Sequence, residues 1–178
     1  VYKRQVSCRS SVSPSECERG GAFYSHQLAQ TICPAGWRLP SDADWHKLIT
    51  VAGKRKNKTC LVEKDAAFAS SEKAKRFPKD LELGTCIAEA GEVIKSTTAW
   101  KKGFNGTDLL HIGFGPEGYR DISKEYLQVD EYAYFWSSDL IENPVFGEGK
   151  PSASSWYVTK SSEVVHEENF TELWMSVR

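Results

Sequence analysis

The spacing of apolar residues in the first third of the chain predicts two helices. After Ser41, four apolar residues follow the i, i+3, i+4, i+7 spacing of one helix face: Trp45, Leu48, Ile49 and Ala52. Ser41 is a suitable N-cap, and the acidic residues Asp42 and Asp44 after it suit the positive end of the helix dipole. An earlier helix is predicted over residues 22–32.

The last third of the chain shows the alternating, aromatic pattern of strands. Strands are predicted over 132–137, 155–160, 164–166 and 173–177, and a shorter apolar strand over 109–114. In the last of them Leu173, Met175 and Val177 share one face, and Trp174 points to the other. Because the helices precede the strands, we expect an α+β domain with a C-terminal antiparallel sheet.

Residues 33–45 join the two predicted helices, and we interpret them as architectural. Pro34-Ala35-Gly36 predicts a tight turn, and the alternation of Trp37 and Leu39 predicts a short strand that turns both side chains inward. Four tryptophans are expected in the core: Trp37, Trp45, Trp136 and Trp174. Two more open positions are expected for Trp100 and Trp156.

Length and charge narrow the class of protein. A chain of 178 residues fits a single domain over 1–178, for which we expect an insertion near 53–98 and truncation at both ends. The formal net charge of −1 does not favour binding to nucleic acid or to an acidic membrane. No apolar run approaches the ~20 residues of a membrane helix, so no membrane insertion is expected in this segment.

The five cysteines indicate an oxidising compartment in which disulfides form, although reduced thiols would also fit part of the pattern. Cys8 and Cys17 bracket a polar loop and are most simply a disulfide, although two reduced thiols fit the same pattern. Cys60 and Cys86 flank a Lys- and Glu-rich segment that a second disulfide would close, stabilising the fold by about 3 kcal/mol. Cys33 belongs to neither of these two pairs, and one interpretation is that it is a buried free cysteine.

Catalytic patterns are absent from the sequence. The four histidines, at 26, 46, 111 and 166, are scattered, and neither a nucleophile elbow nor a phosphate-binding loop occurs. The adjacent carboxylates Asp130-Glu131 and Glu167-Glu168 would face opposite sides of a strand. We therefore predict that the chain is not an enzyme and holds no cofactor.

Several segments occur in an order that resembles the Fibrobacter succinogenes major paralogous domain, a family of bacterial surface and secreted modules. The segments are Gly20–Tyr24, Cys33–Leu48, Pro116–Asp121, Tyr134–Ser138 and Met175–Arg178, and the most specific is Cys-Pro-x-Gly-Trp-x-Leu-Pro at 33–40. The chain departs from the family pattern at His111-Ile112 and at Glu117, and it stops at Arg178 where the family continues with cysteine. The resemblance implies that this next residue is the partner of Cys33.

The resemblance implies a C-type lectin-like fold, with two N-terminal helices packed on a twisted antiparallel sheet and long loops that form a binding face. We predict a non-enzymatic extracellular binding or adhesion module, secreted or on a bacterial cell surface, that recognises a glycan or protein ligand. The alternative is a structural or assembly subunit of a bacterial surface layer or fibre. The expected ligand-binding residues lie in loops over the C-terminal sheet: Glu117, Tyr119, Arg120, Asp139, Glu142, Asn143, Trp156 and Tyr157.

Calcium is the one metal for which the resemblance suggests a site. Asp139, Glu142 and Asn143 offer the oxygen ligands that Ca²⁺ prefers. However, Glu142-Asn143-Pro144 has the wrong order for the sugar-binding tripeptide of calcium-dependent lectins, and Trp136-Ser137-Ser138 replaces their Trp-Asn-Asp. We therefore predict no metal site.

Overall fold

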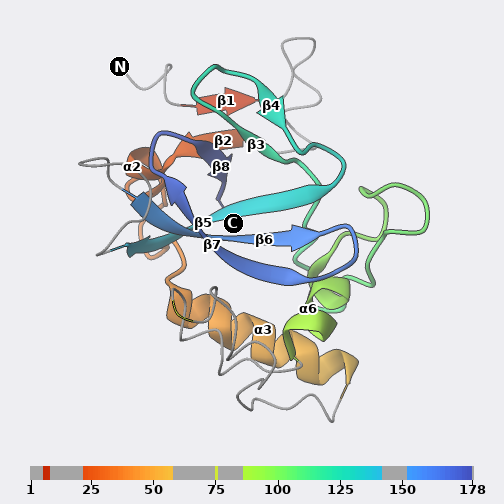
Figure 1. The fold of residues 1–178 in the computed structure, drawn as a ribbon. Helices are drawn as coiled ribbons and strands as arrows, with labels where there is room; N and C mark the ends of the chain where they lie inside the picture. The colour runs from red at the N-terminus through yellow and green to blue at the C-terminus, as the bar shows by residue number, and fades with distance from the viewer. Residues whose placement is uncertain (1–5, 9–21, 58–74, 76–85, 142–151, 178) are drawn as a thin grey trace. The chain divides into compact units, whose positions relative to one another are not determined.

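The computed structural model describes residues 6–8, 22–57, 75, 86–141 and 152–177 of the chain (Figure 1). The helices are α2 (His26–Ala29), α3 (Asp42–Lys56) and α6 (Cys86–Ile94). The strands are β1 (Val6–Cys8), β2 (Ala22–Ser25), β3 (Tyr119–Arg120), β4 (Tyr126–Leu127), β5 (Tyr132–Leu140), β6 (Ser152–Thr159), β7 (Val164–Phe170) and β8 (Trp174–Ser176). The predicted α+β class is confirmed.

The chain divides into two compact units, which are described separately. The first unit contains Val1–Asp42, Pro116–Tyr157 and Glu167–Arg178, and the second contains Ala43–Gly115 and Val158–His166. Strands β6 and β7 each contribute residues to both units. The single domain with an insertion near 53–98 stays a prediction.

The sheet is mixed, which corrects the antiparallel sheet that the sequence predicts. Its strand order is β1-β2-β8-β5-β6-β7, and β3 pairs with both β8 and β4. Strand β8 is antiparallel to β2 but parallel to β5, with Phe135 opposite Ser176. Because β8 is not joined to β5 by a hairpin turn, local sequence does not set their relative direction.

The helix predicted over 22–32 is shorter than expected, because strand β2 takes its first four residues. In β2, Phe23 and Tyr24 pair with Ser176 and Met175 of β8, so a long-range pairing outweighs the local helical pattern. The Ser25 side chain then caps α2 by accepting a hydrogen bond from the Leu28 N–H, at 3.4 Å. This helix is a single turn.

Helix α3 is confirmed, and α6 was not predicted as a helix. The helix α3 begins at Asp42, directly after Ser41, and its residues Trp45 and Ile49 are buried as expected. Helix α6 packs closely on it, since a Cβ added at Gly53 would lie 2.8 Å from the Cβ of Cys86. Alanine and glycine at 88, 90 and 91 obscured the helical pattern of α6 in the sequence.

Residues 33–40 form the predicted turn but not the predicted strand. The Trp37 N–H donates to the Pro34 carbonyl at 2.9 Å, and Gly36 has φ +85°, as a type II turn requires. No strand includes Trp37, and its side chain is 78% exposed, so the expectation of a core tryptophan is wrong there. Leu39 is buried as predicted.

The strand predicted over 109–114 is also wrong. The Asp108 carboxylate accepts hydrogen bonds from the N–H groups of Ile112 and Gly113, both at 2.8 Å, and folds the segment into a turn. Only Phe114 pairs, in an isolated bridge with Lys95. A single aspartate that satisfies nearby backbone donors thus outweighs a short apolar run.

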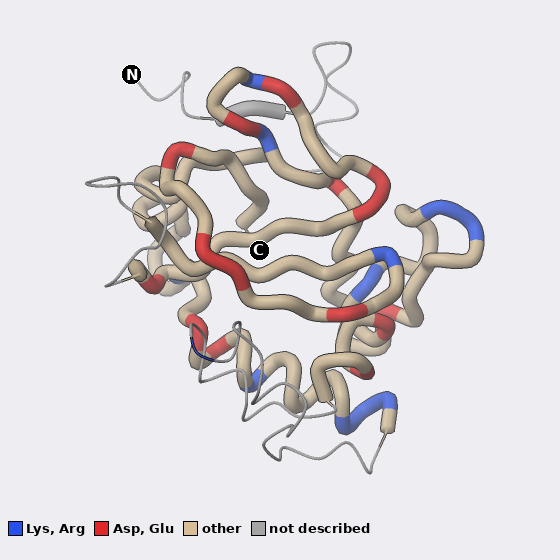
Figure 2. Tube along the Cα trace, in the orientation of Figure 1, with Lys and Arg blue, Asp and Glu red and all other residues tan. Residues whose placement is uncertain are grey.

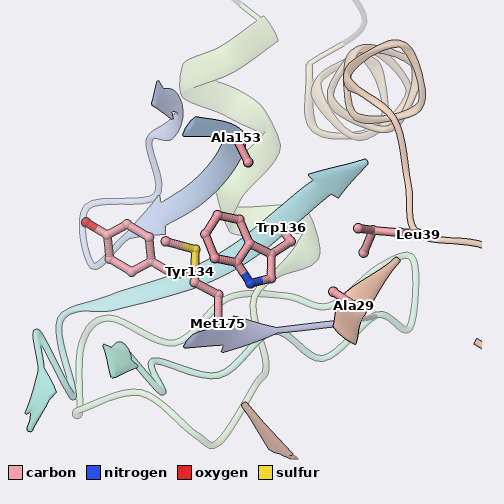
Figure 3. Packing of buried hydrophobic residues seen from close by; sticks show 6 residues of the cluster. All are labelled: Ala29, Leu39, Tyr134, Trp136, Ala153 and Met175. Carbon is pink, nitrogen blue, oxygen red and sulfur yellow. The ribbon is translucent and has the colours of Figure 1, made fainter. Parts of the chain in front are cut away.

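The core of the first unit gathers around Trp136, which lies at the centre of the cluster in Figure 3. The cluster consists of Ala29, Leu39, Tyr134, Trp136, Ala153 and Met175. The Trp136 indole N–H donates to the Tyr24 carbonyl at 2.8 Å, and the His26 ring meets the indole at 5.1 Å between ring centroids. Burial of Trp136 agrees with its predicted core position, whereas Trp174 in β8, also expected in the core, is only half-buried.

The second unit has its own core, in which Trp45 packs against Phe114 with ring centroids 6.0 Å apart. Trp100 is 4% exposed and donates its indole N–H to the Phe114 carbonyl at 2.8 Å, so the more open position expected for it is wrong. Lys95 is fully buried beside it, with Nζ 4.3 Å from the Trp100 ring centroid.

The cysteines are only partly described. Cys33 is a free cysteine and half-buried, whereas Cys86 is disulfide-bonded. Cys17 and Cys60 lie outside the described residues, as does the side chain of Cys8. The pairings Cys8–Cys17 and Cys60–Cys86 therefore stay predictions. Of the helices that the structure describes, none has the length and apolar character needed to cross a membrane.

Candidate functional site

The sheet face of the first unit carries four tyrosines in contact, which we call the tyrosine face: Tyr119, Tyr132, Tyr134 and Tyr157. They come from β3, β5 and β6, and the alternation along β5 turns Tyr132 and Tyr134 to the same side. The Tyr134 ring lies 4.9 Å from Tyr157 and 5.1 Å from Tyr119, and Tyr132 lies 5.6 Å from Tyr157.

The four rings differ in their access to solvent. Tyr134 is 6% exposed and forms the floor, and the other three are half-buried and pack on the core cluster. The Tyr134 hydroxyl donates to the Gln128 amide oxygen at 2.6 Å, and the exposed Gln128 has φ +55°. A non-glycine residue at positive φ is held there by its surroundings, so this bond fixes the amide at the edge of the tyrosine face.

A polar cluster from β6 and β7 belongs to the same unit. The Asn169 amide donates to the Ser155 hydroxyl at 2.8 Å and to Glu167 Oε2 at 3.4 Å. The Ser155 hydroxyl in turn donates to the Glu167 carbonyl at 3.1 Å, which ties β6 to β7. Ser155 and Tyr157 lie two residues apart on β6 and therefore share a face.

The electrostatics of the tyrosine face are acidic. Burial, and then the negative charges of Asp121 and Glu167, raise the pKa of the Tyr119 hydroxyl. Burial, followed by Glu167, also raises the pKa of Tyr134. In the described part of the first unit, ten side chains are Asp or Glu and three are Lys or Arg. Figure 2 shows acidic positions on the loops around β3 and β4 and on β7. Burial and acidic neighbours thus both disfavour the tyrosinate form of Tyr119 and Tyr134.

Of the residues predicted for ligand binding, the structure brings together Tyr119 and Tyr157. Arg120 follows Tyr119 in β3 and points elsewhere, with its guanidinium 4.6 Å from the Trp174 ring centroid. Asp139 accepts a hydrogen bond from the Asp42 N–H at 3.0 Å, and Glu117 is half-buried. Glu142 and Asn143 lie outside the described residues.

The prediction that Trp156 is an open, ligand-binding residue is wrong, because its side chain is only 1% exposed. Its indole N–H donates to Asp42 Oδ1 at 2.9 Å, and Asp42 also accepts a hydrogen bond from the Ser154 hydroxyl. Alternation along β6 places Trp156 on the side opposite to Tyr157. We therefore assign Trp156 a structural role.

Sequence reasoning missed Tyr132, Tyr134, Gln128, Glu167 and Asn169 as site residues. The alternation of tyrosines at 132 and 134 was a usable signal, since it marks one aromatic face of a strand. Gln128 is only six residues from Tyr134, but nothing in the local sequence marks the positive φ that brings its amide there. Among the described residues, no group of three or more His, Cys, Asp or Glu could hold a metal ion.

Comparison with protein-family models identifies the class of module. The model of the Fibrobacter succinogenes major domain matches residues 1–178, and the chain therefore belongs to this bacterial family. Neither the comparison with curated proteins nor that with solved structures finds a match.

Proposed function

We propose that this chain is a non-enzymatic binding or adhesion module of C-type lectin-like fold that works outside the bacterial cell, secreted or on the cell surface. Its ligand is a glycan or a protein, and the contact surface is the tyrosine face. The observation that carries the proposal is the set of Tyr119, Tyr132 and Tyr157, which remain half-exposed over the buried Tyr134. Amphipathic rings held rigidly by neighbouring rings bind ligands at a low entropic cost.

The polar groups beside the rings support this proposal. Sugars present apolar C–H faces and hydroxyls, and the tyrosine face offers ring surface together with the amides of Gln128 and Asn169. Both amides already make hydrogen bonds within the protein, which orients them before any ligand arrives.

The test is a screen of immobilised glycans and surface proteins with the purified chain and with Tyr157→Ala. The variant is expected to weaken binding at least about tenfold, because removing a central aromatic anchor commonly has that effect. Tyr126→Ala is the matched control, since Tyr126 lies on β4 and packs against Phe23, with ring centroids 5.6 Å apart. Wild-type binding that Tyr157→Ala retains in full, with both variants folded, would refute this surface.

A second candidate function is the structural or assembly subunit, and one observation favours it. The first unit holds fourteen Asp and Glu against nine Lys and Arg, whereas the second holds ten against fourteen. Units of opposite net charge favour contacts between the first unit of one copy and the second unit of another. Light scattering at increasing protein concentration tests this function: oligomers that dissociate in 0.5 M salt support it, and a monomer throughout contradicts it.

A further inference from the structure

A second surface lies on the side of β3 opposite to the tyrosine face. Arg120 follows Tyr119 along the strand, so its side chain points to the other side of the sheet. Arg120 is directly opposite both Tyr126 of β4 and Trp174 of β8, and residues opposite each other in paired strands share a face. The guanidinium carbon lies 4.6 Å from the Trp174 ring centroid and 5.9 Å from that of Tyr126. We call Arg120, Tyr126 and Trp174 the arginine row.

The aromatic rings hold the guanidinium without using its hydrogen-bond donors. A cation over an aromatic ring is attracted by the π face, and this attraction leaves the N–H edge of the guanidinium open. The Arg120 Nε–H donates to the Lys124 carbonyl at 3.4 Å. That carbonyl lies in the β3–β4 turn, where the Lys124 N–H donates to the Asp121 carbonyl at 3.1 Å. The arginine is therefore oriented before any ligand arrives, which lowers the entropic cost of binding.

The charge of Arg120 is not neutralised by a carboxylate among the described residues. Asp121, the carboxylate next to it in sequence, belongs to the turn: it accepts hydrogen bonds from the Ser123 hydroxyl at 2.7 Å and from the Glu125 N–H at 2.9 Å. In the described part of the chain Arg120 forms no ion pair, and Nε–H is its only donor in a hydrogen bond. The terminal Nη groups therefore have donors available to a ligand.

We propose that the arginine row binds the carboxylate of a uronate sugar in an acidic glycan. A guanidinium is planar, and its parallel N–H groups match the oxygens of a carboxylate. A single arginine matches the single negative charge of a uronate, and the half-buried rings of Tyr126 and Trp174 beside it offer apolar surface to the C–H groups of the sugar. Because the row and the tyrosine face lie on opposite sides of β3, this site goes beyond the proposed function and does not depend on it.

The test measures, by calorimetry at pH 7 and low salt, the affinity of uronate oligomers and of their neutral methyl esters. The wild-type chain is expected to bind the acid about tenfold more tightly than the ester, because hydrogen bonds between charged groups commonly add about that factor. Arg120→Lys keeps the positive charge but loses the planar fork, and it is expected to remove most of this preference. Lys124→Gln is the matched control, since it removes an exposed positive charge from the same turn and leaves the arginine row intact.

A preference for the acid that Arg120→Lys loses and Lys124→Gln retains supports the proposed site. Equal affinity for acid and ester, or no binding of either, overturns it. Equal losses in the two variants also overturn it, because diffuse positive charge would then attract the ligand. Binding of a glutamate-rich peptide and of no uronate overturns the glycan as the ligand.

Two further variants separate this site from the tyrosine face. Tyr126→Ala, which removes a ring of the arginine row, is expected to weaken the binding of uronate oligomers, whereas Tyr157→Ala is expected to leave it unchanged. An acid preference lost in Tyr157→Ala and kept in Arg120→Lys would place the carboxylate at the tyrosine face. The proposed site would then be wrong, and the proposed function would stand.

A second measurement uses the wild type alone, because Arg120→Lys also changes the packing on Trp174. NMR of the side-chain N–H groups follows Arg120 Nε–H and the Trp174 indole N–H during addition of the uronate oligomer. Both resonances are expected to shift with the acid and to stay in place with the methyl ester, since both groups belong to the arginine row. Resonances that do not move at millimolar uronate would refute the proposed site.

Discussion

Replacing Lys95 with methionine removes a buried amine from the second unit and is expected to change how stability depends on pH. The residue directly follows α6 and is 0% exposed. Its Nζ donates to the Lys160 carbonyl at 2.8 Å and to the Ser162 hydroxyl at 3.1 Å. Burial lowers the pKa of Lys95 from 10.5 to about 8, and the nearby charge of Glu92 opposes this only in part.

The magnitude and its sign follow from this pKa. Below pH 8 both the folded and the unfolded chain carry the proton, and the free energy of unfolding does not change with pH through this group. Between pH 8 and 10.5 only the unfolded chain holds the proton, so the free energy of unfolding rises with pH. The full rise is at most about 3 kcal/mol. The two hydrogen bonds and the Trp100 ring favour the ammonium and set this as an upper limit.

Guanidinium unfolding of the wild type and Lys95→Met at intervals from pH 7 to pH 10.5 measures the effect. Other groups, including the tyrosines, titrate in both proteins and cancel in the difference. From pH 7 to pH 10.5, the free energy of unfolding of the wild type is expected to rise by about 1–3 kcal/mol relative to that of the variant. Lys102→Met, which removes an exposed lysine, is the control and is expected to give a flat difference. A difference between wild type and Lys95→Met that stays constant with pH would refute the reasoning.

Three other predictions test the fold. Trp37→Ser is expected to change the free energy of unfolding by less than about 0.5 kcal/mol, and Trp45→Ser by more than about 3 kcal/mol, because the two side chains are 78% and 3% exposed; equal losses in urea unfolding would contradict this. Gly91→Ala is expected to lower the melting temperature far more than Gly103→Ala, since the added Cβ would lie 1.9 Å from the Ser162 carbonyl oxygen at Gly91, whereas at Gly103 nothing lies within 4 Å and the cost is only that of a non-glycine residue at φ +92°; similar melting temperatures would count against the close packing of α6. Burial lowers the pKa of His26 below 6.5, against the opposing hydrogen bond to the Ser137 carbonyl. The unfolded chain therefore binds the proton first, and stability is lost as pH falls below about 6.5; denaturant titrations at pH 5 and pH 7.5 should show a smaller loss in His26→Gln, and an equal loss would exclude His26 as its source.

Local signals in the sequence predicted those elements whose residues interact with near neighbours. The helix after Ser41 and the turn at Pro34–Gly36 depend on caps, spacing and a glycine at positive φ, all of which are legible within a few residues. Strand β2 depends on β8, about 150 residues away, and the parallel direction of β8 depends on β5, about 40 residues away, so no local pattern encodes either pairing.

The candidate site was predictable only in part for the same reason. Tyr119 and Tyr157 were singled out as aromatics beside predicted loops and strands, and the structure places both in one cluster. Trp156 was misjudged because the next residue along a strand faces the opposite side, and the sequence does not tell which side is covered. Trp37 was misjudged because an alternating triplet indicates a strand only where a partner strand pairs with it.

The position of β8 has a consequence for the order of events during folding. Its three residues lie between β2 and β5 in the sheet, yet they are numbered 174–176 and their neighbours 22–25 and 132–140. Until this segment leaves the ribosome, β2 and β5 lack the strand that joins them, and Trp136 lacks the side chain of Met175 beside it. Pairings of such sequence separation are slow to close. We expect the first unit to complete its folding only after synthesis has passed residue 176, and the strands made earlier to wait until then with their edges unpaired.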